Sequence, residues 1–225
     1  MDSSQINVGR DVQGNIIVGD KNKIIGYSAE QVSALIAQIS TTFQPKPFDG
    51  CCPYKGLDVF EEEDAELFFG REKVVDDLVS RVKESRTVFI TGPSGSGKSS
   101  LVRAGLIHAL RGGAIQDLHS ERWLYETVKP GREPLEALAS AFSRLKSPEL
   151  ENYFRKHADQ ANILHECAES ALSGQTNQRL VLFIDQFEEV FTQVSKENAA
   201  RFLDTLTDAA AGENGRVIIL FSMRS

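Results

Sequence analysis

The chain has 225 residues, of which 41% are hydrophobic and 25% charged, and its formal net charge is -7 at pH 7. This composition is typical of a folded globular protein, and the negative charge argues against nonspecific binding to nucleic acid, which requires a basic surface. The sequence has no run of 18 apolar residues, no signal region and no disulfide framework among its 3 cysteines, so we expect a cytoplasmic protein with no membrane span.

Residues 1–27 form a separate compositional block at the N-terminus. This block is rich in Gly, Asn, Ile and Val, and it lacks a helical period. The stretches "INVGRDVQGN" and "IIVGDKNKII" align with their Val-Gly pairs superposed. The alignment predicts two short strands with a turn at Gly14 and Asn15.

Residues 28–50 are expected to form an amphipathic helix followed by a linker. Ser28 and Gln31 have the spacing of a capping box, and apolar residues recur on one helical face as far as Phe43. The stretch "QPKPFDGCCP" then brings prolines and a glycine, which end the helix. The main domain is therefore expected to span residues 51–225.

Helical and strand patterns alternate through this main domain. Helices are predicted over residues 64–85, 98–113, 133–145, 148–173 and 196–211. Strands are predicted over residues 87–91, 122–130, 179–186 and 215–225. Short, continuously apolar strands separated by helices indicate a mostly parallel sheet buried on both faces. We therefore predict an α/β fold, a P-loop NTPase three-layer sandwich, preceded by a helix and a short β-prone N-terminal segment.

A glycine-rich loop follows the first strand of the main domain. The stretch "GPSGSGKS" matches Gly-x-x-x-x-Gly-Lys-Ser, the Walker A phosphate-binding loop. Its glycines let successive backbone N–H groups turn inward around an anion, and the next helix adds the positive end of its dipole. Lys98 should reach the β- and γ-phosphates, and the Ser99 hydroxyl should bind Mg2+. The predicted nucleotide contacts here are Gly92, Pro93, Ser94, Gly95, Ser96, Gly97, Lys98, Ser99 and Ser100.

Three carboxylates lie at and after the end of the strand at 179–186. Asp185 is predicted to hold Mg2+ through water, as the Walker B acid does. Either Glu188 or Glu189 could orient the attacking water, and we place Glu189 slightly ahead. Fast ATPases of the AAA and ABC types carry a glutamate directly after the aspartate, where this chain has Gln186. We therefore expect slow turnover, well below the value of about 10 per second that is typical of enzymes.

Two other nucleotide-binding classes share the loop pattern. The stretch "LSGQ" at residues 172–175 resembles the signature of ABC transporter ATPases, but one glycine is missing and no helix separates it from Asp185. Nucleoside-monophosphate kinases do not follow their aspartate with "QFEE". Neither class fits the chain.

The words between these motifs resemble the novel STAND NTPases, signal-transduction ATPases related to NACHT and NB-ARC proteins. The resemblance covers residues 53–225 and rests on "YKGLDVFEEEDAELFFGRE", "GPSGSGKSSLVRAGLIHAL", "VKPGREPLEALA", "VLFIDQFEEVF" and "VIILFSMRS" in that order. It implies an ATP-driven switch that rests with ATP or ADP bound, opens on a stimulus and forms a homo-oligomer. Assembly would bring effector modules together, an output that suits bacterial defence or regulated cell death.

The resemblance also implies further site residues. "FFGR", with Phe69, Gly70 and Arg71, corresponds to the segment beside adenine and ribose. Arg224 corresponds to the arginine that senses the γ-phosphate. The preference for adenine over guanine rests on the resemblance. The sequence contains no Asn-Lys-x-Asp, the pattern that reads guanine, which agrees with this preference. Family members continue past "MRS" into a further strand, a helical lid and sensor repeats, so we expect a core truncated at its C-terminal end.

The N-terminal block resembles a second kind of motif. "IIVGDKNKI" is similar to the amyloid signalling motifs called RHIM, in which apolar residues zip between stacked chains and an asparagine forms an amide ladder. Such a segment would bind an effector protein that the sequence does not identify. A simple hairpin is the other reading of this segment. The alternative function for the whole chain is a scaffold, in which residues 1–27 drive assembly and the nucleotide site is structural.

Overall fold

A computed structural model describes residues 15–18, 23–26, 30, 55–56, 58–172, 177–212 and 215–225. The chain divides into two compact units, Met1–Cys52 and Pro53–Ser225. The helix and linker expected over residues 28–50 fall, Glu30 apart, outside the described residues. Among the described helices, none has the length and apolar character that crossing a membrane requires.

The first unit contains an antiparallel strand pair. β1 (Asn15–Val18) pairs with β2 (Lys23–Gly26), and Ile16 lies opposite Ile25. The turn predicted at Gly14 and Asn15 is wrong, because Asn15 begins β1. All but the first residue of β1 and the last residue of β2 lie within the second of the aligned stretches, where consecutive isoleucines favour extended backbone on each side of residues 19–22.

The second unit is built on one parallel sheet, as predicted. Its strands, in the spatial order β3-β6-β5-β4, are β3 (Thr87–Gly92), β6 (Val217–Arg224), β5 (Leu180–Ile184) and β4 (Leu124–Val128). All residues of β5 are buried, which explains its continuous apolar run. The register places Gly92 of β3 beside Arg224 of β6, and Ile184 of β5 beside Phe221 of β6.

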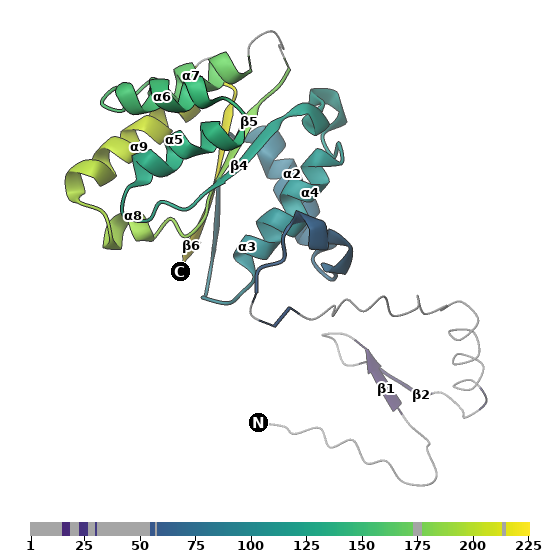
Figure 1. The fold of residues 1–225 in the computed structure, drawn as a ribbon. Helices are drawn as coiled ribbons and strands as arrows, with labels where there is room; N and C mark the ends of the chain where they lie inside the picture. The colour runs from purple at the N-terminus through teal and green to yellow at the C-terminus, as the bar shows by residue number, and fades with distance from the viewer. Residues whose placement is uncertain are drawn as a thin grey trace. The chain divides into compact units, whose positions relative to one another are not determined.

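Helices cover both faces of this sheet (Figure 1). One face carries α5 (Pro134–Arg144), α6 (Pro148–Lys156), α7 (Ile163–Ala171) and α9 (Lys196–Ala211). The other face carries α2 (Glu72–Glu84) and a helix that runs through α3 (Lys98–Ser100), the π-helical η2 (Leu101–Ile107) and α4 (His108–Arg111). Short elements complete the unit: the 3-10 turns η1 (Glu62–Leu67), η3 (Gln116–Leu118) and η4 (Ser120–Arg122), and α8 (Glu189–Thr192).

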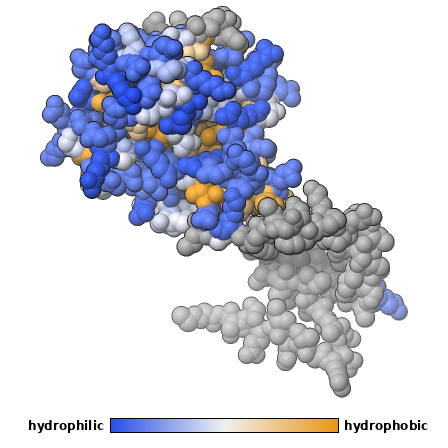
Figure 2. Space-filling model, viewed as in Figure 1, coloured by the Kyte–Doolittle hydropathy of each residue, from blue (hydrophilic) through white to orange (hydrophobic). Residues whose placement is uncertain are grey.

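Alternate residues of β5 enter two separate cores. Leu182 packs with the helices around α5, whereas Val181 and Phe183 pack with those around α2. The predicted three-layer α/β sandwich is therefore confirmed. On the face of the second unit seen in Figure 2, the coloured residues are mainly hydrophilic, with hydrophobic residues scattered among them.

Two predicted helices are each interrupted. Residues 64–85 form η1 and α2, separated by residues 68–71, where Gly70 has a φ of 78° that no right-handed helix contains. Residues 148–171 form α6 and α7, separated by residues 157–162. The helical period continues across the second break because α6 and α7 both bury apolar residues in the core around α5, whereas η1 has no buried residue.

Gly105, inside η2, allows a close approach between helices. A Cβ atom built on it would lie 2.7 Å from Val75 Cγ2 of α2 and 3.3 Å from Phe68 Cε1. Glycine normally weakens a helix by about 1 kcal/mol relative to alanine. Its presence here is explained by packing rather than by helix propensity.

We expect Gly105→Ala to lower the melting temperature. Overpacking costs about 1–3 kcal/mol and outweighs the gain in helix propensity, and each kcal/mol shifts Tm by about 2–4 °C in a protein of this size. Thermal unfolding measures this shift. Val75→Ala should be less harmful in the Gly105→Ala background than in the wild type, and a stabilised Gly105→Ala protein would contradict the packing argument.

Candidate functional site

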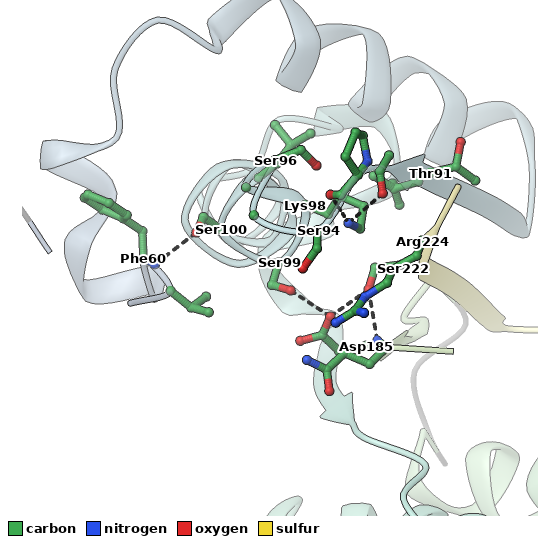
Figure 3. Close-up of a pocket in the computed structure, with 18 of the residues that line it drawn as sticks. Phe60, Thr91, Ser94, Ser96, Lys98, Ser99, Ser100, Asp185, Ser222 and Arg224 are labelled. Carbon is green, nitrogen blue, oxygen red and sulfur yellow. Dashed lines mark hydrogen bonds between the residues drawn. The ribbon is translucent and has the colours of Figure 1, made fainter. Parts of the chain in front are cut away.

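A pocket of about 740 Å³ opens at the carboxyl edge of the sheet. The loop of residues 92–97 and the first residues of the following helix line one side of it, and residues at the ends of β5 and β6 line another (Figure 3). Residues 58–60, which precede η1, also contribute to its wall. Segments far apart in sequence therefore converge here, as is usual at the carboxyl ends of parallel strands.

Two glycines of the loop at residues 92–97 adopt left-handed backbone angles. Gly95 and Gly97 have φ values of 74° and 81°, in the left-handed region that other residues avoid. Gly97 is the residue directly before the helix that starts at Lys98. The Lys98 ammonium donates to the carbonyl oxygens of Gly92 and Pro93, at 2.9 and 2.8 Å. All of residues 92–100 line the pocket.

Asp185 is the most enclosed acid of the pocket. It is 1% exposed, and its backbone N–H donates to the carbonyl of Val128 at the end of β4. Carboxylate oxygen Oδ1 accepts hydrogen bonds from the Ser99 hydroxyl at 2.7 Å and the Ser222 hydroxyl at 2.6 Å (Figure 3). Oxygen Oδ2 accepts from Arg103 Nη2 at 3.1 Å. The structure thus joins the loop helix, β5 and β6 through one carboxylate.

Gln186 turns the chain sharply after β5. Its φ is 59°, an uncommon value for a residue with a side chain. Its backbone N–H donates to the Ser222 hydroxyl at 3.0 Å, and the next N–H, of Phe187, donates to the Ser222 carbonyl at 2.8 Å. Ser222 therefore holds both the Asp185 carboxylate and the turn behind it.

The two glutamates after this turn lie in different places. Glu188 lines the pocket, and its Oε1 lies 3.3 Å from Nε of Arg224, which also lines the pocket. Glu189 does not line it, and its Oε2 instead accepts from the Gly131 backbone N–H at 3.2 Å. The geometry favours Glu188 over Glu189, the reverse of the preference drawn from the sequence.

The "FFGR" segment is only partly at the pocket. Arg71 lines it, whereas Phe69 is 76% exposed and Gly70 bonds its N–H to Glu72 Oε1 at 2.9 Å. Phe68, one residue earlier than predicted, lines the pocket, as does Phe60. The break between η1 and α2 turns Phe68 inward and leaves Phe69 in solvent.

Sequence reasoning missed the wall made by residue 56 and residues 58–60. Its Phe60 backbone N–H donates to the Ser100 hydroxyl at 3.1 Å, which fastens the wall to the loop helix. Lys55 pairs with Asp64 of η1, and this hydrogen bond, together with one from the Glu61 backbone, holds the pKa of Asp64 below its usual value. The only signal in the sequence was the word "YKGLDVF", to which no chemistry could be assigned.

These residues suit a phosphate-bearing ligand accompanied by a divalent cation. Lys98, Arg71 and Arg224 bring positive charge to a glycine-rich loop, and the volume lies in the usual range for small-molecule sites. Mg2+ prefers oxygen ligands and is held by one or two carboxylates, with water and substrate phosphates completing its shell. Ser99 and Asp185 supply such oxygens, and among the described residues no cluster of three or more His, Cys, Asp or Glu side chains offers another metal site.

A family model described as novel STAND NTPase 1 matches residues 53–225. Among solved structures, the chain is similar to the Aeropyrum pernix ORC2 protein in its ADPNP-ADP complexes, with 14% sequence identity and a TM-score of 0.43. The alignment covers 70% of this chain and 41% of that one, so this chain spans less than half of that relative's length. No curated protein matches the chain.

Proposed function

Because the chain belongs to the novel STAND NTPase 1 family, we propose that its pocket binds ATP with Mg2+ and hydrolyses it slowly as a molecular switch. The observation that carries this proposal is the 2.7 Å hydrogen bond between Ser99 and Asp185. It places a loop hydroxyl and a buried strand-end carboxylate together, 86 residues apart in sequence, at the oxygen-rich point where a triphosphate and its cation would meet.

Each pocket residue has a role in this proposal. The backbone of residues 92–97 would surround the phosphates, and Lys98 would move from the Gly92 and Pro93 carbonyls to the β- and γ-phosphates. Ser99 and Asp185 would hold Mg2+, which when bound neutralises charge on the phosphates. Arg71 and Phe68 would lie beside the nucleoside, the part that Phe69 and Gly70 were expected to contact.

Arg224 is proposed to report the nucleotide state. Its side chain is 63% exposed and lies next to Glu188, so it can exchange this acid for a γ-phosphate at little cost. ADP would leave the pair with Glu188 in place. An Arg224→Ala protein should lose its preference between ATP and ADP, and an unchanged preference would count against the role.

Slow turnover follows from the residue after Asp185. Gln186 is neutral and cannot act as a base, and the first glutamate after Asp185 comes three residues later, at Glu188. Phosphate release by the purified 225-residue chain, with saturating ATP and Mg2+, tests this proposal. We expect turnover well below about 10 per second. Turnover at or above that value would contradict the slow switch.

Glu188 and Glu189 can be separated by amide substitutions of equal size. Glu188→Gln should lower turnover by about 10²–10⁴-fold if Glu188 orients the attacking water, because general-base contributions have this size. Glu189→Gln should change turnover by less than about 3-fold, because its carboxylate holds the Gly131 N–H, which an amide oxygen also accepts. Single-turnover phosphate release compares both variants, and a larger loss in Glu189→Gln would reverse the assignment.

The nucleotide state is proposed to control self-association and effector recruitment, with defence or regulated cell death as the output. Residues 16–24 carry the RHIM-like amyloid motif in this proposal. A peptide of residues 1–27 should form fibrils that bind thioflavin, and a peptide that stays soluble and unstructured at high concentration would leave the hairpin of β1 and β2 as the better reading.

The scaffold alternative predicts assembly that does not depend on nucleotide. Its support is the strand pair β1–β2, whose short isoleucine-rich strands can recruit further chains at their edges. Sedimentation of the wild type and Lys98→Ala, each with and without ATP, separates the two functions. Equal assembly of both proteins favours the scaffold, whereas ATP-dependent assembly of the wild type alone favours the switch.

A further inference from the structure

Arg103 joins the buried acid of the pocket to the pocket wall. It lies in η2, beyond the glycine-rich loop, and does not itself line the pocket. Its Nη2 lies 3.1 Å from Asp185 Oδ2, and its Nη1 donates to Glu61 Oε1. Asp185 and Glu61 are 124 residues apart in sequence, and the guanidinium bridges them across the loop helix.

The contact with Asp185 determines how that carboxylate is held. The side chains of Asp185 and Arg103 are 2% and 15% exposed, so both ions have lost most of their water. Oδ1 is occupied by the hydroxyls of Ser99 and Ser222, and among the described residues Arg103 is the one cation that pairs with Asp185. The guanidinium therefore keeps Oδ2 away from the loop and Oδ1 toward Ser99, and it offsets the cost of a buried charge.

The second arm of Arg103 reaches the wall. Glu61 follows Phe60 directly, and Phe60 bonds its N–H to Ser100. A different arginine of the same helix, Arg111, pairs through Nε with Glu62 Oε2 at 2.8 Å, but does not contact Asp185 and does not line the pocket. The wall and η1 are thus attached to the loop helix at several points, and of these Arg103 is the one that also touches Asp185 among the residues described.

The Arg103 side chain is held in one particular orientation. Its Nε is buried and has no hydrogen-bond partner among the described residues, an uncommon arrangement that costs stability. The unsatisfied Nε has an explanation in the other two nitrogens. The orientation that lets them reach Asp185 and Glu61 together leaves Nε without a partner. The π-helical turn places Arg103 for this bridge, in agreement with the frequent occurrence of such turns at functional sites.

We propose that Arg103 is a positioning residue that couples the pocket wall to Asp185, so that Mg2+-dependent nucleotide binding requires both of its arms. This inference rests on the proposed function, because it assigns a regulation to the same pocket. When the wall is ordered, Glu61 holds Arg103, and Arg103 orients the Asp185 carboxylate to bind Mg2+. Binding of Mg2+ at Asp185 in turn orders the wall beside the nucleoside. Arg103 acts through Asp185 and does not touch the nucleotide.

The test compares ATP affinity in Mg2+ with ATP affinity in EDTA, measured by isothermal titration on the 225-residue chain. Arg103→Met should weaken binding in Mg2+ by about 10–100-fold, the size of a hydrogen-bonded charge contact, and by less than about 3-fold in EDTA. Arg111→Met is the matched control, since it removes an arginine of the same helix from the same wall segment. It should change neither affinity by more than about 3-fold.

Two further variants keep the test decisive if Arg103→Met folds poorly. Arg103→Lys retains the charge beside Asp185 but has one terminal nitrogen and cannot bridge, so it should recover part of the Mg2+-dependent loss. Glu61→Gln should weaken binding in Mg2+ by about 3–10-fold in the wild type and have no further effect beside Arg103→Lys. Additive losses from Glu61→Gln and Arg103→Lys would overturn the coupling.

The outcomes separate this inference from the proposed function. Equal losses in Mg2+ and EDTA for Arg103→Met, or the same loss for Arg111→Met, would show a purely structural role and overturn the inference alone. A wild-type chain that does not bind ATP at all, in either solution, would remove the proposed function and the inference with it.

Discussion

Lys98→Ala is expected to lower the affinity for ATP with Mg2+ by about 10²–10⁴-fold. The substitution removes the two charge-assisted hydrogen bonds that Lys98 would donate to the β- and γ-phosphates, of about 1.5–3 kcal/mol each. The Lys98 side chain lies over the glycine-rich loop and bonds to the carbonyls of Gly92 and Pro93. No other lysine lines the pocket among the described residues, so nothing on the loop replaces its charge. Isothermal titration measures the loss.

The control for this variant is Lys83→Ala. Lys83 is a half-exposed lysine of α2 that pairs with Asp117 at 2.9 Å and does not line the pocket. It changes the net charge by the same amount, so it removes any general electrostatic contribution from the comparison. ATP affinity equal in Lys98→Ala and Lys83→Ala would show that the loop does not bind the phosphates.

Asp185→Ala is expected to have the largest effect on stability and to abolish the Mg2+ dependence of nucleotide binding. Removing one partner of a buried ion pair costs about 3–5 kcal/mol, since Arg103 then loses its buried counter-ion and keeps only Glu61, whose side chain is 46% exposed. The hydroxyls of Ser99 and Ser222 also lose their acceptor. Because each kcal/mol corresponds to about 2–4 °C in a protein of this size, thermal unfolding should show a fall in Tm of about 6–20 °C.

A second substitution distinguishes this ion-pair effect from general damage. In Asp185→Ala combined with Arg103→Met, neither charge remains, so most of the lost stability should return, as it does when apolar residues replace a whole buried pair. Binding should nevertheless stay insensitive to Mg2+, because the metal acid is still missing. A double variant as unstable as Asp185→Ala would show that the ion pair is not the cause.

The sequence was sufficient to predict the fold of the second unit. Strands such as β5 are apolar at every position, and Pro134 at the start of α5 marks a helix beginning. These signals depend only on residues that are close together in the sequence, so they can be recognised without the structure. The family was also identified correctly, from words that extend over residues 53–225.

The details of the site depend on geometry that local patterns do not contain. Glu188 and Glu189 are adjacent in sequence, and the left-handed turn at Gln186 decides which of them enters the pocket. The same holds for Phe68 and Phe69, because the break at Gly70 moves the ring that faces inward by one position. A shift of one residue rotates a side chain by about 100° on a helix, so motif alignment alone cannot resolve such neighbours.

Contacts between distant segments could be predicted only where both residues belong to a known motif, as Ser99 and Asp185 do. Arg103 pairs with Asp185 across 82 residues, and Phe60 bonds to Ser100 across 40 residues. Arginine within an apolar helix usually indicates a residue that extends to solvent, and only the packed structure shows that this one is enclosed. The wall made by residue 56 and residues 58–60 was missed for the same reason, since it carries no motif and acquires its role through position.

The central claim, that this pocket binds ATP through Mg2+ held by Ser99 and Asp185, is tested most directly by titrating ATP into the 225-residue chain with Mg2+ and with EDTA. We expect one site per chain, tighter binding in Mg2+ than in EDTA for the wild type, and equal binding in both solutions for Asp185→Asn, which keeps the side-chain shape but loses the charge. Wild-type binding that does not respond to Mg2+, or an Asp185→Asn protein that responds as strongly as the wild type, would contradict the account.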